Sequence, residues 1–155
     1  MWIPTYKSWR LNESHFGILT DKPKNQLASH FSEDDIKRLK TDTSFQPPPT
    51  VPGQENPSDD PRYDILDPRV KPNGESIDMM WKRAYPYFAD NIIPDLMKGK
   101  KVLLVCHGNV IRAIRMHFEN CTGLEVMKQS VIPNGSPYVM EFDEHMNVIG
   151  TRYIK

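Results

Sequence analysis

The sequence predicts one mixed α/β domain, and three observations support this class. A short apolar run at Val102–Val105 leads directly into an amphipathic helical pattern that begins after His107. A longer helical pattern covers residues 75–97, and two strand-like runs flank a turn near the end of the chain. Strands that alternate with helices are typical of α/β domains, and the closing pair adds an antiparallel element. The 155 residues are enough for one core.

Residues 2–13 carry a weak strand pattern. A short helix is predicted over residues 32–39, because Ser32 is a credible N-cap and acidic residues fill the first turn. Residues 46–74 form a proline-rich, polar connection that cannot be the interior of a helix. So long an irregular stretch inside one domain is uncommon and is often functional.

The helix over residues 75–97 is the clearest prediction, with Pro86 and Pro94 expected to kink or interrupt it. A turn then leads into a buried strand over residues 101–106. The remaining elements follow in order and are a second short helix at 122–129 and a hairpin of strands at 138–142 and 147–154.

Composition favours a soluble, cytoplasmic protein. The mean hydropathy is −0.60, and no run approaches the roughly 20 apolar residues of a membrane span. Twenty basic residues balance twenty acidic ones, which argues against a general role at nucleic acids or membrane surfaces. The two cysteines, Cys106 and Cys121, suggest neither a disulfide framework nor a metal site. We expect no metal, since His30, His117 and His145 do not converge with other ligand types.

The strongest local motif is His107-Gly108-Asn109. It would place an imidazole at the carboxyl end of a strand, where open α/β sheets bind their ligands. The helix that starts there offers free backbone N–H groups and a positive dipole end to an anion. The motif therefore predicts phosphate handling by a histidine, with a purely structural turn as the alternative.

Two weaker sets of residues precede this motif. Glu13 beside His15 could form an acid–base pair, although a solvated loop is the better interpretation from the residues alone. A loose basic set could receive a phosphate or carboxylate, but most such side chains are plain solvated surface. Its members are Lys22, Lys24, Lys37, Arg38 and Lys40.

Taken in order, these segments resemble the cofactor-dependent phosphoglycerate mutases of the histidine phosphatase superfamily. Residues 8–17 resemble the family's Trp-Arg-Leu-Asn-Glu-Arg-His-Tyr-Gly block, and residues 100–112 resemble the segment with its second catalytic histidine. These two blocks are specific. Further matches lie at residues 47–49, 60–63, 75–76, 132–137 and 141–143.

The resemblance implies a three-layer α/β fold, with helices on both faces of a sheet. It also implies interconversion of 3-phosphoglycerate and 2-phosphoglycerate in glycolysis through a phosphohistidine, with 2,3-bisphosphoglycerate as phosphoryl primer and no metal. The partners would be small phosphorylated three-carbon acids, and the chain could form a homo-oligomer. By residue-level match, His107 would contact the transferring phosphate and Glu13 would be the acid–base residue. The implied substrate-binding residues are Phe16, Lys24, Lys40, Gly108 and Asn109.

The resemblance also shows which of the family's functional residues this sequence does not contain. The family's phosphorylated histidine lies in an Arg-His-Gly near its N-terminus, and this sequence has no Arg-His-Gly. We therefore expect one partial domain over residues 1–155, without the family's N-terminal strand and helix. Ser14 stands where the family has an arginine, and Phe16 where it has a tyrosine. Lys40 and Thr41 replace its paired arginines.

Two functions are compatible with this pattern. The first is a phosphoglycerate mutase, an isomerase, whose nucleophile-bearing segment is absent from this sequence; without a nucleophile no covalent phosphoenzyme forms. The second is a non-catalytic remnant that binds phosphorylated metabolites or pairs with a full-length mutase subunit. The departures at Ser14, Lys40 and Thr41 lie outside the absent segment and favour relaxed or altered activity.

Overall fold

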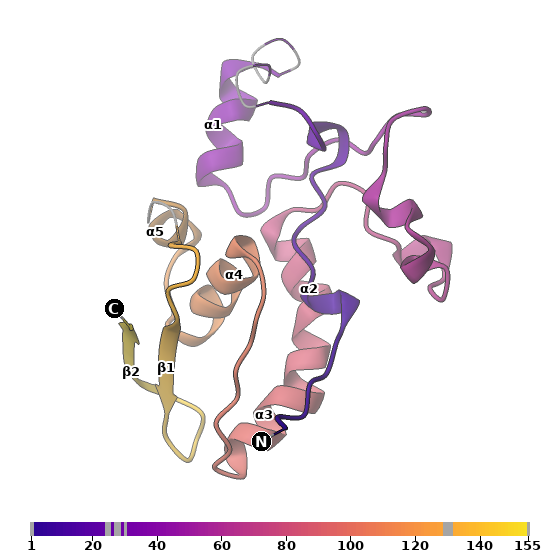
Figure 1. The fold of residues 1–155 in the computed structure, drawn as a ribbon. Coiled ribbons are helices and arrows are strands. Elements are labelled where there is room, and N and C mark those ends of the chain that lie inside the picture. Colours follow the sequence, from indigo (N-terminus) through magenta and orange to yellow (C-terminus); the bar gives the residue numbers. More distant parts are fainter. Residues whose placement is uncertain (1, 24–25, 27–28, 30, 129–131, 155) are drawn as a thin grey trace.

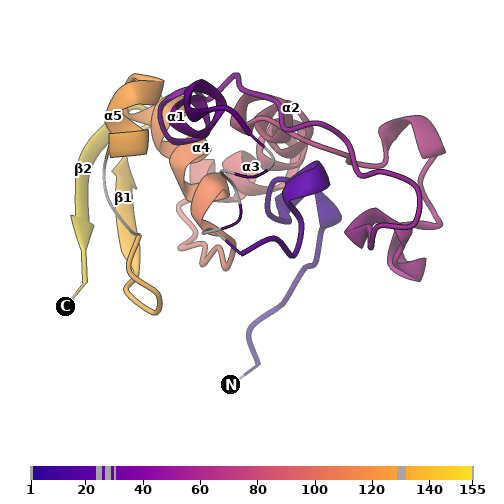
Figure 2. The same ribbon diagram turned by 90° about the horizontal axis from the view of Figure 1, so that it is seen from above.

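The computed structural model describes the whole chain except residues 1, 24–25, 27–28, 30, 129–131 and 155. Its centre is α4, which lies between a long helical rod and a β-hairpin in both views (Figures 1 and 2). The rod comprises α2 (Ile77–Tyr87), a π-helical turn η7 (Phe88–Ile92) and α3 (Ile93–Met97), and α4 is Gly108–Phe118. The other elements are α1 (Glu33–Thr41), α5 (Gly123–Lys128), β1 (Tyr138–Phe142) and β2 (Val148–Tyr153). The predicted mixed α/β class is confirmed.

The core forms where the rod meets α4. The rod contributes apolar side chains at helical spacing, including the fully buried Met80 and Ala84, and α4 contributes the fully buried Val110. Spacing of three or four residues places such side chains on one face of each helix, so two apolar stripes meet. The hairpin joins this core through Met140 and through an edge-to-face contact between Phe118 and Phe142.

The predicted helix over residues 75–97 is confirmed, including its irregularity. The Ser76 side chain caps α2 by accepting a hydrogen bond from the Met79 amide. Pro86 lies inside α2, and the chain continues through it into η7 and α3. Pro94 has no N–H to donate one turn back, and the wider π turn stands immediately before it.

The other local predictions are mostly confirmed. Ser32 caps α1 as predicted, and its side chain accepts a hydrogen bond from the Asp35 amide. The predicted helix over 122–129 is α5, and its last predicted residue, Gln129, lies outside the described residues. β1 matches its prediction, and β2 pairs with it antiparallel, with an irregularity between Glu141 and Phe142.

The weak strand prediction for residues 2–13 is wrong at Trp9–Leu11, which form a 3₁₀ turn, η1. The Ser8 hydroxyl accepts a hydrogen bond from the Arg10 amide, and this local bond favours a turn over a strand. The carbonyls of Trp9 and Arg10 accept hydrogen bonds from Arg83 of α2, so they do not need a neighbouring strand.

The proline-rich connection over residues 46–74 is irregular, as predicted. It contains three 3₁₀ turns, η4 (Pro57–Asp59), η5 (Pro61–Tyr63) and η6 (Pro68–Val70), and each begins with a proline after a capping Asn or Asp. Gly17 and Gly74 pack directly on its first residues. Both have positive φ, and a Cβ at either position would lie 2.0–2.3 Å from a backbone oxygen of Pro47 or Pro48.

The predicted buried strand over residues 101–106 is wrong. The segment belongs to no sheet among the described residues, because the two-stranded sheet consists of β1 and β2 alone. Leu104 and Cys106 pack against the core, but Leu103 and Val105 are 82% and 86% exposed. A strand needs a neighbouring ladder for its backbone groups. The apolar run predicted burial, but a strand forms only beside a neighbouring strand, and no described segment pairs with residues 101–106.

The C-terminal end of α4 is tied to the hairpin by a buried ion pair. The Arg115 guanidinium donates to the Glu119 carboxylate at 2.9–3.1 Å, and the Tyr138 hydroxyl donates to the same carboxylate. Burial works to raise the pKa of Glu119, but these hydrogen bonds outweigh it and lower the pKa below its ordinary value. The carboxylate is therefore charged at neutral pH, and it links α4 to β1.

No helix in the described part of the chain has the length and apolar character needed to cross a membrane.

We predict that the double variant Leu103→Lys, Val105→Lys associates less with itself and unfolds at the same temperature as the parent. Exposed apolar side chains on an unpaired extended segment favour association. Surface substitutions of this kind usually change stability by no more than about 0.5 kcal/mol. Light scattering and thermal unfolding measure the two effects. A large drop in unfolding temperature would show that these side chains are buried, contrary to the structure.

Candidate functional site at the start of helix α4

The predicted His107-Gly108-Asn109 motif forms the beginning of α4. His107 is the N-cap residue, with an extended backbone, and its carbonyl accepts the first helical hydrogen bond from Ile111. Its side chain makes no capping bond, and the residue is exposed to solvent. The amides that follow have no carbonyl partner inside the helix, so they are available to an acceptor. This end of α4 also carries the positive end of the helix dipole.

The structure brings Glu13 to this helix end from 96 positions away in the sequence. Its carboxylate accepts hydrogen bonds from the Asn109 amide at 3.4 Å and from the Ser14 amide at 2.9 Å. A carboxylate is stabilised at this position by the amides and by the dipole. Glu13 therefore lies beside the His107 motif, at the start of α4.

Asn109 connects Ser14, the residue after Glu13, to the next turn of α4. Its side-chain nitrogen donates to the Ser14 hydroxyl at 2.9 Å, and its side-chain oxygen accepts from Nη1 of Arg112 at 3.0 Å. Ser14 is only 4% exposed, so this contact is shielded from water. The side chains of Ser14, Asn109 and Arg112 form one continuous hydrogen-bonded chain beside Glu13.

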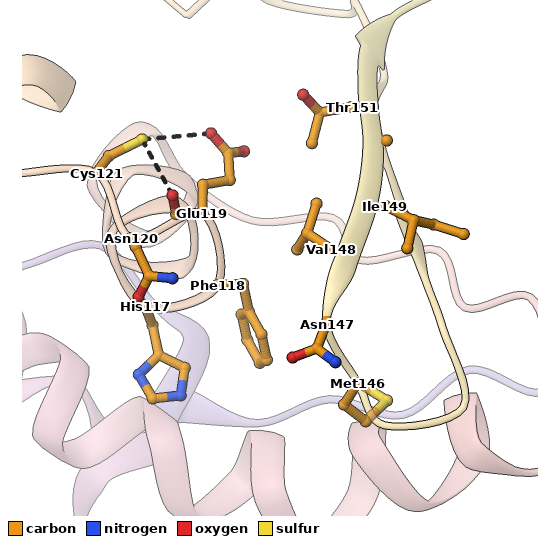
Figure 3. Close-up of a pocket in the computed structure, with 11 residues that line it drawn as sticks. His117, Phe118, Glu119, Asn120, Cys121, Met146, Asn147, Val148, Ile149 and Thr151 are labelled. Carbon is orange, nitrogen blue, oxygen red and sulfur yellow. Dashed lines mark hydrogen bonds between the residues drawn. The ribbon is translucent and has the colours of Figure 1, made fainter.

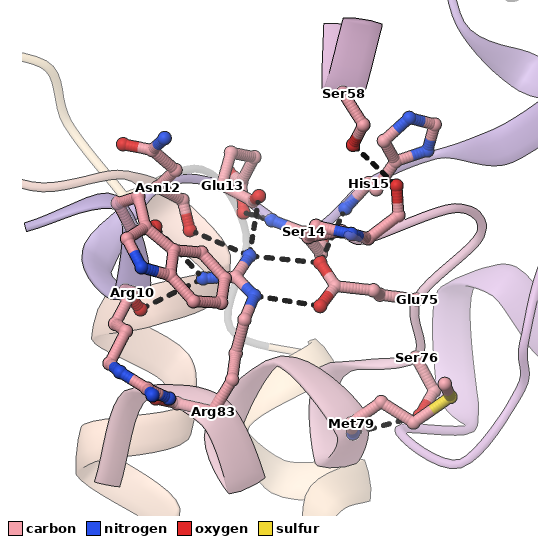
Figure 4. Close-up of polar contacts among 12 residues, drawn as sticks. Arg10, Asn12, Glu13, Ser14, His15, Ser58, Glu75, Ser76, Met79 and Arg83 are labelled. Carbon is pink, nitrogen blue, oxygen red and sulfur yellow. Dashed lines mark hydrogen bonds and ion pairs between the residues drawn. The ribbon is translucent and has the colours of Figure 1, made fainter. Parts of the chain in front are cut away.

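Glu13 is held in place by a buried ion pair between Glu75 and Arg83 (Figure 4). The guanidinium of Arg83 donates to the Glu75 carboxylate at 2.7–2.8 Å, and both side chains are at most 10% exposed. The same guanidinium also donates to four backbone carbonyls of the 9–13 segment. These belong to Trp9, Arg10, Asn12 and Glu13.

His15 is part of this framework and not an acid–base partner of Glu13. Its Nδ1 accepts hydrogen bonds from the amides of Gly17 and Gly74, at 2.9 and 3.1 Å. Since both partners are donors, Nδ1 carries no proton, and Nε2 donates to Asn56 Oδ1 at 2.8 Å. The predicted solvated loop is wrong here, because His15 is buried and its backbone bonds Glu75.

A small cavity of about 50 Å³ lies beside the start of α4. Asn109 and Phe16 are on its wall, so the structure brings these two predicted substrate residues together. His107 is not among the lining residues. Lys40 lies exposed on α1, next to the wall residue Leu39, and does not line the cavity. Lys24 lies outside the described residues.

A larger open pocket of about 700 Å³ lies at the other end of α4, against β2 (Figure 3). Its lining includes His117, Glu119 and Cys121, none of which belongs to the predicted site. Among the described residues there is no group of three His, Cys, Asp or Glu side chains that could hold a metal ion.

Sequence reasoning missed the residues that position the site. Glu75 lies directly before Ser76, the N-cap of α2, and Arg83 lies eight positions later, inside that helix. Nothing in the sequence identifies the 9–13 carbonyls as the partners of Arg83, because that contact depends on tertiary packing. Arg112 was visible only as a polar residue of an amphipathic helix.

Comparison with known proteins identifies relatives along nearly the whole chain. A family model described as "Histidine phosphatase superfamily (branch 1)" matches residues 54–154. The chain is 37% identical over 155 residues to the 2,3-bisphosphoglycerate-dependent phosphoglycerate mutase of Streptococcus pyogenes serotype M5 (strain Manfredo). The same identity is found with the protein of that name from S. pyogenes serotype M49 (strain NZ131). Each match covers 99% of this chain and 67% of the relative.

We predict that Glu75→Gln destabilises the protein by about 3 kcal/mol, because it leaves the buried Arg83 charge without its counter-ion. Asp67→Asn is the matched control, since the Arg69–Asp67 pair is exposed and such pairs contribute little to stability. Chemical denaturation of both variants measures the difference. Equal stabilities would show that the Glu75–Arg83 pair does not hold the 9–13 segment.

The thiol of Cys106 gives a pH-dependent test of the same site. Burial raises its pKa to about 11, and the negative charge of Glu13 adds to the rise. With that pKa, about one thiol in a thousand is ionised at pH 8, and the thiolate is the reactive form. In a Cys121→Ser background we therefore expect very slow alkylation of Cys106 at pH 8, accelerating through pH 10. Rapid labelling at pH 8 would contradict the burial and the neighbouring carboxylate.

Proposed function

Because this chain belongs to the histidine phosphatase superfamily, we propose that it supplies the phosphate-binding and acid–base half of a phosphoglycerate mutase site. The proposed substrates are 3-phosphoglycerate and 2-phosphoglycerate, the proposed pathway is glycolysis, and the proposed setting is the cytoplasm. The observation that carries this proposal is the meeting of Glu13 with the start of α4, directly after His107.

The start of α4 suits a phosphate group for electrostatic reasons. Backbone N–H groups at a helix N-terminus bind phosphate well, and the helix dipole favours negative charge there. His107 is exposed and makes no capping bond, so its imidazole is available to a phosphate oxygen. In its charged form it would donate a strong hydrogen bond to the phosphate as negative charge develops on the oxygens. Asn109 adds an amide donor at the same helix end.

Glu13 is placed to exchange a proton with a substrate hydroxyl. Its two carboxylate oxygens are held by the Ser14 and Asn109 amides, so the side chain is oriented before a substrate arrives. General acid–base work requires a group within hydrogen-bond reach of the reacting oxygen. A carboxylate at the edge of a phosphate site meets this requirement for the hydroxyl next to the phosphorylated carbon.

The donor set also fits one phosphate group of 2,3-bisphosphoglycerate, the primer named in its relatives. That compound would supply a phosphoryl group. A histidine phosphatase transfers the group through a nucleophilic histidine, and this sequence contains no Arg-His-Gly to provide one. We therefore propose that the residues described here bind and orient phosphoglycerates, and that turnover needs a nucleophile from outside this set.

A second candidate function is a non-catalytic protein that binds phosphorylated metabolites or pairs with a full-length mutase subunit. One observation favours it. Ser14 stands where the resembling block has an arginine, and its buried hydroxyl accepts a hydrogen bond from Asn109. A neutral residue thus occupies the position of a positive charge. Electrostatics and positioning do most of the work in phosphoryl transfer, so this exchange favours binding over catalysis.

We predict weak, saturable binding of 3-phosphoglycerate by the 155-residue chain, measured by titration calorimetry at millimolar ligand. His107→Gln should weaken binding by about tenfold or more, since a hydrogen bond to a charged group contributes about 1.5–3 kcal/mol. His145→Gln is the matched control, because His145 is exposed on the hairpin far along the chain. A folded protein that gives no heat with millimolar ligand would rule out this proposal.

We also predict no mutase turnover above background when 3-phosphoglycerate and 2,3-bisphosphoglycerate are added to the isolated chain. The measurement is the production of 2-phosphoglycerate. Flux that His107→Ala abolishes would show that these residues contain their own nucleophile, and the non-catalytic candidate would then be excluded.

A further inference from the structure

We propose that Arg112 is a positioning residue that fixes the orientation of the Asn109 carboxamide at the start of α4. This inference rests on the proposed function, because the carboxamide is one of the donors offered to phosphate. Arg112 itself lies one turn further into the helix.

The hydrogen bonds of Asn109 are the first part of the argument. A carboxamide has an accepting oxygen and a donating nitrogen that exchange places when the group flips. Arginine can only donate, so Nη1 of Arg112, at 3.0 Å, requires the oxygen of Asn109 to face it. The nitrogen must then face the other way, where it lies 2.9 Å from the Ser14 hydroxyl. In the flipped orientation, two donors would face each other at Arg112.

Position along the helix makes this contact a local one. Arg112 follows Asn109 by three residues, a spacing at which side chains on a helix are neighbours. Gly108, one residue before Asn109, has no side chain, and a Cβ there would lie 3.4 Å from Nη1 of Arg112. The guanidinium therefore lies along the first turn of α4, close to the backbone that carries the motif.

Arg112 also has one buried atom without a hydrogen-bond partner in the described part of the chain. Its Nε is buried and has no hydrogen-bond partner among the described residues. An unpaired buried donor costs free energy. If Arg112 only stabilised the helix, the free energy would be lower with its guanidinium fully in water. The arginine is instead held inward with Nη1 on Asn109.

The orientation has a consequence for ligand binding. With its oxygen committed to Arg112, Asn109 presents only N–H groups to the rest of the site. One of these two hydrogens bonds Ser14, and the other is left to donate to an oxyanion. Asn109 also lines the small cavity beside Phe16. A carboxamide whose orientation is fixed before the ligand arrives does not have to be ordered when the ligand binds.

The test compares Arg112→Met, which keeps the length of the side chain but removes its donors, with Arg112→Lys, which restores a donor. Nitrogen-resolved NMR of the free protein follows the two Asn109 side-chain N–H resonances. We expect them to be distinct and sharp in the parent, shifted and broadened in Arg112→Met, and largely restored in Arg112→Lys. Arg152→Met, which removes an exposed arginine of β2, should leave them unchanged. Unchanged Asn109 resonances in folded Arg112→Met would overturn the proposal.

Titration calorimetry with inorganic phosphate, which can be applied to every variant, separates this inference from the proposed function. We expect Arg112→Met to weaken phosphate binding about fivefold to tenfold, and to have no further effect in an Asn109→Ala background. Additive losses would show that Arg112 acts independently of Asn109 and would overturn its positioning role. A parent chain that does not bind phosphate would count against the proposed function, while the NMR comparison of the free proteins would still decide the role of Arg112. If Arg112→Met fails to fold, Arg112→Ala is the second variant without a donor, and unchanged Asn109 resonances in folded Arg112→Ala would overturn the proposal.

Discussion

The buried ion pair between Glu75 and Arg83 determines how the rest of the site is arranged. A guanidinium with five donors has more hydrogen-bonding capacity than one carboxylate can satisfy. Arg83 uses the surplus on backbone carbonyls of the 9–13 segment, while Glu75 uses its second oxygen on the amide of His15. The segment, whose only regular element is the 3₁₀ turn η1, is thereby fixed to α2 without belonging to an α-helix or a sheet. The position of Glu13 follows from this attachment.

His15 extends the same framework to the proline-rich connection. Its ring accepts from two glycine amides and donates to Asn56, so it joins the 15–17 turn, residue 74 and the first 3₁₀ turn of the connection. The contacts of Gly17 and Gly74 with Pro47 and Pro48 have the same effect. These contacts help to tie the long loop to the start of α2, where Glu75 begins the ion-pair network.

Sequence reasoning succeeded where local rules decide the outcome and failed where distant partners do. The cap at Ser32, the prolines of the long helix and the closing hairpin follow from local chemistry, and they were predictable. The strand over 101–106 was not, because an apolar run indicates burial only if a neighbouring strand is available. The meeting of Glu13 with α4 followed from the family resemblance. The roles of Arg83 and Arg112 required coordinates, since each depends on which carbonyl or carboxamide packs beside it.

Helix α4 connects two polar networks of different character. At its start, Glu13 and Asn109 lie beside exposed His107, and the donors there are only partly used. At its end, Glu119 is surrounded by Arg115, Tyr138 and Cys121, which satisfy its carboxylate. A satisfied network stabilises a fold, whereas spare donors at a helix N-terminus favour an incoming anion. This difference supports the proposal that phosphate binds at the start of α4, although the larger pocket lies at its other end.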